Sequence, residues 1–154
     1  MEKVKIYIDT SVIGGCFDDE FSKWSNKLFE EFRSGNKIAV ISDLVIEELK
    51  NAPIKVKNKL KEIPDEFIII ANNNAAMTQL AEEYLKQEVL SKKFKDDALH
   101  IATATILNID VLVSWNFKHI VNFNRIKQFN GVNLLNGYNE IDIRSPQEVI
   151  DNED

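Results

Sequence analysis

The sequence predicts an α/β protein in which helices surround a mainly parallel sheet of four to five strands. Short apolar runs alternate along the chain with longer segments whose apolar residues recur at helical spacing, and this alternation favours a parallel sheet with right-handed crossovers. The first run is rich in β-branched residues and ends abruptly at an acid, as strands of buried parallel sheets often do. The 154 residues, 44% of them hydrophobic, can build one sizeable core. We therefore expect a single domain over residues 1–154.

The opening segment, VKIYIDTSVI over residues 4–13, begins with the first predicted strand, which stops at three polar residues, Asp9, Thr10 and Ser11, before Val12 and Ile13 resume the apolar run. Ligands of parallel sheets bind just beyond the carboxyl ends of the strands, which is where Asp9 would lie. An alternative is that Asp9 only caps the following turn, with Thr10 and Ser11 as ordinary turn-forming residues.

The remaining elements follow from apolar spacing and from helix start and stop signals. Gly35 ends the first long helix, Ser42 is a suitable N-cap, and Pro64 ends a lysine-rich helix. Three further strands are predicted, at residues 37–41, 67–71 and 110–113. The predicted helices span residues 22–32, 43–51, 54–63, a long segment capped by the asparagines at 72–74 and reaching about residue 90, residues 94–107, and a short stretch from Ser145–Pro146.

Composition narrows the class of protein. No apolar run approaches the roughly 20 residues needed to span a bilayer, and the N-terminus does not resemble a signal peptide. Cys16 is the only cysteine, so no internal disulfide is available and a reducing, cytoplasmic location is expected. The net charge of −6 argues against a nonspecific nucleic-acid binder. Acids gathered at one site could nevertheless be offset by cations, so a metal-dependent enzyme that acts on phosphodiesters stays open.

Three acids occupy positions that a parallel sheet can bring to one edge. Asp9 ends the first strand, Glu48 lies on the helix after the second, and Asp97 lies in the first turn of the helix before the fourth. Clustered carboxylates repel one another unless a cation or a proton compensates, and hard oxygen ligands suit Mg²⁺ or Mn²⁺.

In the order and spacing of these acids, the chain resembles the PIN-domain nucleases, and in size it is most similar to the VapC-type toxins. The resemblance rests on four motifs in order: YIDTSV, ISDLVIEEL, DDALHIATA and LVSWNFKHI. It implies a three-layer α/β/α sandwich and Mg²⁺- or Mn²⁺-dependent cleavage of RNA, plausible for the toxin of a type II toxin–antitoxin pair. It also implies an antitoxin protein as partner and a homodimer, with no membrane association.

The resemblance assigns Asp9, Glu48 and Asp97 as the catalytic and metal-binding acids, and treats Glu47 and Asp96 as solvated neighbours. Residues expected to contact substrate are Thr10, Ser11, Ser114 and Trp115. The chain departs from the family at the fourth acid, where Asn116 and His119 stand. Asn116 is expected to be a weak metal ligand through its amide oxygen.

The histidines and tryptophans allow two interpretations each. His100 could be catalytic, but a core position with a hydrogen bond to backbone is the expectation, and His119 is expected at the surface. Trp24 is expected in the core. Trp115 could stack on a base or could simply cover the end of the sheet.

Two other functions compete with the ribonuclease. One is a PIN-fold module that binds RNA or protein but cuts poorly, because the fourth acid is missing. The other is a phosphatase with Asp9 as covalent nucleophile, which is weakened because Ser11 stands where such enzymes carry a second acid.

Overall fold

A five-stranded parallel sheet crosses the computed structural model, which describes residues 2–151. The strands are β1 (Lys5–Ile8), β2 (Ile38–Ser42), β3 (Ile68–Ala71), β4 (Val111–Val113) and β5 (Ile143–Arg144). Their order is β3-β2-β1-β4-β5, and every neighbouring pair is parallel. This confirms the predicted α/β class and the upper of the two predicted strand numbers.

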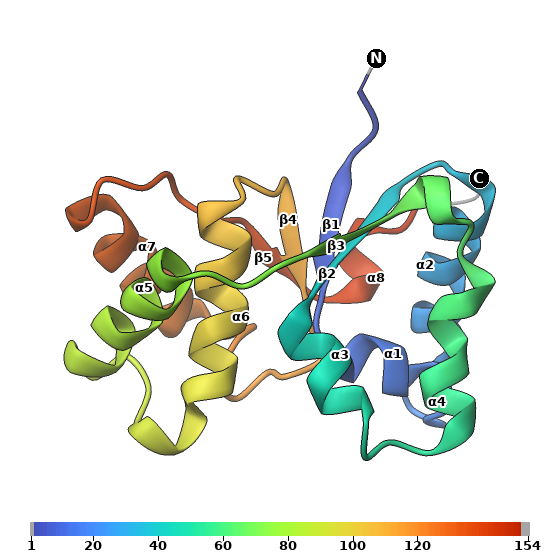
Figure 1. The fold of residues 1–154 in the computed structure, drawn as a ribbon, viewed down its shortest axis with the longest axis horizontal. Coiled ribbons are helices and arrows are strands. Elements are labelled where there is room, and N and C mark those ends of the chain that lie inside the picture. The colour runs from blue at the N-terminus through green and yellow to red at the C-terminus, as the bar shows by residue number, and fades with distance from the viewer. Residues whose placement is uncertain (1, 152–154) are drawn as a thin grey trace.

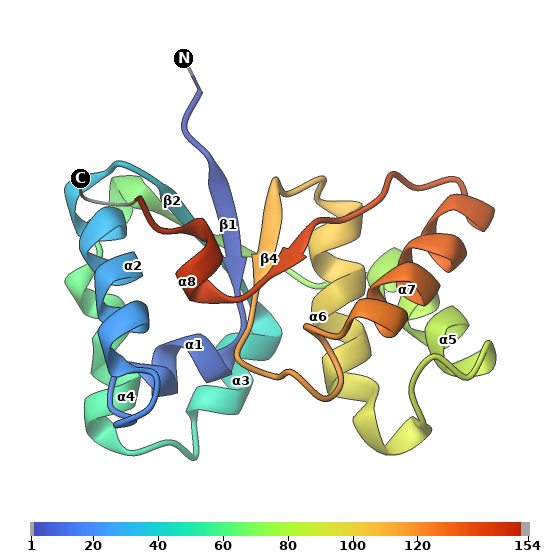
Figure 2. The ribbon, with the colours of Figure 1, turned by 180° about the vertical axis from the view of Figure 1, so that it is seen from behind.

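Helices form a layer on each side of the sheet (Figures 1 and 2). One layer contains α1 (Thr10–Gly15), α2 (Ser22–Ser34), α3 (Asp43–Leu49), α4 (Ile54–Lys59) and α8 (Pro146–Val149). The other contains α5 (Ala75–Lys86), α6 (Lys95–Ile106) and α7 (Phe123–Leu135). The described residues also include three single-turn 3₁₀ helices. Two lie between α4 and β3, namely η1 (Leu60–Glu62) and η2 (Asp65–Phe67), and η3 (Lys92–Phe94) lies between α5 and α6. The predicted three-layer sandwich is therefore confirmed.

The core lies on both faces of β1, β2 and β4. Most of their side chains are fully buried, and aromatic rings of α2 such as Phe29 and Phe32 pack onto them. Each such ring removed from water contributes roughly 1.5–3 kcal/mol. Cys16 is buried in this core, as expected. No helix within residues 2–151 is long and apolar enough to cross a membrane.

Several elements differ from the prediction. The helix predicted over residues 54–63 is α-helical only to Lys59, and η1 continues it. The helix expected to reach residue 90 ends at Lys86, because Glu88 adopts a left-handed backbone (φ 61°) and the Val89 N–H bonds back to the Tyr84 carbonyl. Helix α1 starts directly after Asp9, in the segment where only a turn was considered. Helix α7 was not predicted, because its 13 residues include three asparagines and one glycine, which are poor helix formers.

Candidate active site

The site lies where the carboxyl ends of β1 and β4 meet. Successive strands run from β1 outward to β3, after which the chain returns to place β4 on the other side of β1. Such a reversal opens a crevice beyond the strand ends, and ligands of open α/β sheets bind there. Asp9 directly follows β1 and Ser114 directly follows β4, so both flank this crevice.

Asp9 is a buried carboxylate held by two serines. The Ser11 hydroxyl donates to Oδ1 and the Ser114 hydroxyl donates to Oδ2, each at 2.6 Å. The Trp115 backbone N–H donates to the Ser11 hydroxyl at 3.0 Å, which ties the loop after β4 to α1. Burial raises the pKa of Asp9 above its usual value, although the positive charge of His100 and the two serine hydrogen bonds oppose the rise. The two side-chain groups that donate hydrogen bonds to Asp9 are therefore neutral hydroxyls.

Glu48 ends a chain of hydrogen bonds that starts in the core. Its Oε1 accepts from the Thr10 hydroxyl at 2.6 Å and lies 2.8 Å from His100 Nε2. His100 Nδ1 lies 2.7 Å from the Tyr7 hydroxyl, which lies 2.9 Å from the Ser42 hydroxyl. An ionised carboxylate only accepts, so Nε2 donates to Glu48. In the neutral ring Nδ1 accepts from the Tyr7 hydroxyl, and in the protonated ring Nδ1 donates to that oxygen. The chain fixes both the position and the tautomer of His100.

The same contact shifts the pKa of both partners. Burial alone would raise the pKa of Glu48, but the hydrogen bond and charge of His100, together with Thr10, lower it below its usual value. Burial alone would lower the pKa of His100, but the hydrogen bond that the ring donates to Glu48 and the charges of Asp9, Glu48 and Asp97 raise it. The three acids therefore act on one imidazole.

Asp97, in the first turn of α6, accepts from the loop after β4. Its Oδ2 lies 3.1 Å from His119 Nδ1 and 3.3 Å from the Asn116 amide nitrogen. Burial raises the pKa of Asp97, the charges of His100 and His119 lower it, and the charge of Asp9 raises it again. Asp97 and Asp9 are thus close enough to repel each other.

Asn116, whose role as a weak metal ligand stays a prediction, uses both ends of its amide within the protein. Its amide oxygen accepts the His119 backbone N–H at 3.0 Å, and this contact turns the amide nitrogen toward Asp97. The prediction of a surface His119 is wrong, since the residue is buried and its ring lies 3.7 Å from the Phe94 ring, centroid to centroid. Both positions where the family has an acid therefore hold donors to Asp97.

His100 is buried, as expected, but its partners are the side chains of Glu48 and Tyr7 instead of backbone. Sequence reasoning missed this role, although His100 lies one helical turn after Asp97 and thus on the same side of α6. Glu47 and Asp96 are exposed, in line with their interpretation as solvated neighbours.

Two of the predicted substrate contacts are buried. Ser114 is inaccessible and is occupied by Asp9, and the Trp115 ring is only 6% exposed. The indole stacks on Phe21 at 4.2 Å and donates to the Ser25 hydroxyl at 2.9 Å. Of the two interpretations of Trp115, stacking on a base and covering the end of the sheet, the burial of the residue favours the second. Thr10 and Ser11 direct their hydroxyls to the acids.

The kind of donor at the site fits a hard divalent cation: three carboxylates, one of them buried among hydroxyls and repelled by another. Within residues 2–151, however, no three acidic, histidine or cysteine side chains are grouped so as to hold one metal ion. Each carboxylate is oriented by its own serine, threonine, histidine or asparagine donors.

The fold is similar to those of two solved structures. VapC20 of Mycobacterium tuberculosis, a sarcin–ricin loop cleaving toxin, matches with a TM-score of 0.57 at 15% identity, over 88% of this chain and 98% of that chain. VapBC2 from Rickettsia felis, bound to a DNA fragment from its promoter, matches with a TM-score of 0.59 at 18% identity, over 92% and 98%. No protein-family model and no curated protein sequence matches the chain. The fold is thus that of a VapC-type PIN domain, as the sequence resemblance predicts.

Proposed function

We propose that this protein is a divalent-metal-dependent endoribonuclease and the toxin of a type II toxin–antitoxin pair. The proposal is supported by the positions of three acids: Asp9 directly follows β1, Glu48 on α3 bonds to Thr10 and His100, and Asp97 on α6 bonds to the loop that follows β4. The likeness in fold to VapC20 and VapBC2 supports it.

In this proposal Asp9, Glu48 and Asp97 hold the metal. The bound cation would supply an activated water and a polarised phosphate. The protein side chains prepare the acids for it: Ser11 and Ser114 orient Asp9, while Thr10 and His100 orient Glu48 in the ionised form. Repulsion between Asp9 and Asp97 is the energetic reason for a cation to bind.

The same proposal places the protein in the cytoplasm as a homodimer with an antitoxin protein as partner. Light scattering at tens of micromolar tests the dimer, and a strict monomer would contradict it.

A second candidate is a catalytically weak module that binds RNA or protein. Asn116 and His119 favour it, because both stand where an acid is expected and both donate to Asp97. They reduce the negative charge available to a metal.

Cleavage of a labelled RNA in Mn²⁺, Mg²⁺, Ca²⁺ or EDTA separates the two. We expect cleavage with Mn²⁺ or Mg²⁺ only, and its loss in Glu48→Gln and Asp97→Asn. The exposed neighbours provide matched controls, since Glu47→Gln and Asp96→Asn remove the same charge one residue away. Equal losses in the controls would contradict the site assignment. RNA binding with no metal-dependent cleavage by the wild type would favour the second candidate.

A thermal measurement tests the metal independently of cleavage. Mn²⁺ should raise the Tm of the wild type, because it binds only the folded state, by an amount that corresponds to about 2.7 kcal/mol at 100 times its Kd. The rise should be smaller in Asp97→Asn than in Asp96→Asn.

A further inference from the structure

We propose that an exposed rim beside Asp97 binds an unpaired strand of RNA, with one base stacked on Phe117 and phosphates on Lys92, Lys93 and Lys118. This rests on the proposed ribonuclease function and adds the form of the substrate and the residues that hold it.

Phe117 offers the aromatic surface that Trp115 cannot. It is 49% exposed and lies on the loop after β4, next to Asn116, which contacts Asp97. Its ring meets Trp115 edge-on, with centroids 6.1 Å apart and planes at 65°. Trp115 is itself fixed by Phe21 and Ser25. An edge contact of this kind supports the Phe117 ring without covering its face, so a base can stack there.

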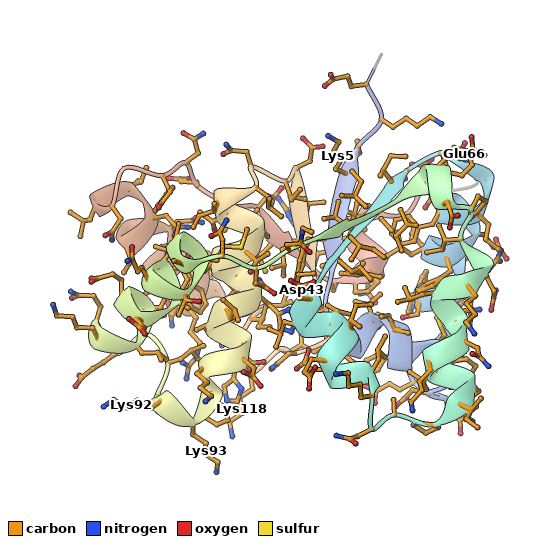
Figure 3. The ribbon with its side chains drawn as sticks, viewed as in Figure 1. Lys5, Asp43, Glu66, Lys92, Lys93 and Lys118 are labelled. Carbon is orange, nitrogen blue, oxygen red and sulfur yellow. The ribbon has the colours of Figure 1, made fainter. Side chains whose placement is uncertain are left out.

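Three lysines lie at the end of the molecule where η3 meets this loop (Figure 3). The stacking of Phe94 on His119 brings η3 against the loop after β4, and Lys93 and Lys118 each directly precede one of these two rings. Figure 3 shows Lys92, Lys93 and Lys118 at the same end of the molecule. All three are exposed, and none has an ion-pair partner within the part of the chain that the structure describes.

The positive charge of these lysines is opposite in sign to the net charge of the protein. The chain carries a net charge of −6, so a phosphodiester that approaches Asp9 and Asp97 is repelled unless local cations offset the acids. Lysines at the rim supply this attraction, and an aromatic face supplies sequence-tolerant stacking; together they are the usual means of holding single strands. In a duplex the base faces are already stacked, so Phe117 would have none to bind.

Binding of fluorescently labelled RNA of about 10 nucleotides, measured by anisotropy in EDTA, tests the proposal without cleavage. We expect Phe117→Ala to weaken binding of the single strand about 5- to 150-fold, the equivalent of one lost base stack, and Phe117→Trp to restore it. Lys93→Gln/Lys118→Gln should reduce the slope of log K against log salt by about 1.4, for two lost phosphate contacts. A duplex of the same sequence should bind more weakly and be insensitive to Phe117→Ala.

The chain offers matched controls for both changes. Phe123 is 72% exposed on α7, and Lys57 and Lys61 are exposed near α4. Phe123→Ala and Lys57→Gln/Lys61→Gln should each change the affinity for the single strand less than about twofold. The lysine control should also reduce the slope of log K against log salt by less than Lys93→Gln/Lys118→Gln does. Equal effects in rim and control variants, or equal affinity for strand and duplex, would overturn the proposal.

The outcome is separable from that of the proposed function. Metal-dependent cleavage with unchanged KM in Phe117→Ala and Lys93→Gln/Lys118→Gln would overturn the rim and leave the nuclease standing. The expected binding pattern without cleavage in any metal would support the rim and overturn the nuclease.

Discussion

Replacement of Asp9 by asparagine is expected to stabilise the metal-free protein while it abolishes the proposed activity. Asp9 is 4% exposed, and its two oxygens accept from Ser11 and Ser114 at 2.6 Å. Asparagine has nearly the same shape; its oxygen can accept from one serine and its amide can donate to the other, because a hydroxyl both donates and accepts. The substitution therefore removes the charge and keeps the packing.

The magnitude follows from this comparison. An ionised carboxylate buried against two neutral hydroxyls costs more than an amide in the same contacts, by about 1–3 kcal/mol on the scale of buried polar groups. For a chain of this length each kcal/mol changes the Tm by about 2–4 °C. We therefore expect Asp9→Asn to raise the Tm in EDTA by about 2–12 °C at pH 7.5.

The gain should depend on pH with a definite sign. Burial raises the pKa of Asp9 in the folded protein, whereas in the unfolded chain it titrates near 3.9. Below about pH 4 both states are protonated, and the wild type and the variant should differ little. As the pH rises toward the folded pKa the unfolded state releases its proton first, so the wild type loses stability relative to the variant. Loss of the His100 proton, whose charge helps to keep Asp9 ionised, acts in the same direction.

Urea unfolding followed by circular dichroism between pH 4 and 8 measures this difference. Asp96→Asn, an exposed carboxylate on α6, is the control and should show no comparable gain. A variant less stable than the wild type at pH 7.5, or a gain that does not change with pH, would refute the reasoning.

Two further substitutions test the surroundings of the acids. Gly15→Ala should lower the free energy of unfolding by about 1–3 kcal/mol in urea titrations, because an added Cβ would lie 2.7 Å from both Ser25 Oγ and Trp115 Nε1, while Gly14→Ala, with nothing within 4 Å, should cost nothing. Asn116→Asp should keep the acceptor for the His119 N–H but place a second carboxylate beside Asp97, with a repulsion of up to about 4 kcal/mol in EDTA. Thermal melts should show that Mn²⁺ reverses this loss, and an unchanged Tm in EDTA would contradict the contact.

The fold could be predicted, and the three acids could be located relative to the strand ends, because both depend on local signals. Apolar runs bounded by Asp9, Ser42 and Ser114 mark strand ends, and the acids stand at fixed positions relative to them. The partners of His100 could not be predicted in this way. A histidine on a mostly apolar helix looks the same whether it bonds to backbone or to Glu48, which is 52 residues away in the sequence.

Trp115 illustrates the same limit for an aromatic residue. Its direction is set by Phe21 and Ser25, which come from a segment more than 80 residues earlier in the chain, with 90 residues separating Trp115 from Ser25. Nothing in the motif around Trp115 itself indicates a buried ring, so its exposure could be learned only from the tertiary structure.

The hydrogen bonds around the acids have a consequence for biosynthesis. Asp9 is held by Ser114 across 105 residues of sequence, and Tyr7 meets His100 across 93. A nascent or proteolysed chain that stops before α6 contains Asp9 and Glu48 but lacks the third acid, the imidazole and the loop that orients them. Long-range contacts of this kind form late in folding. The proposed activity should therefore appear in one step when synthesis is nearly finished, and a fragment that ends before α6 should lack it.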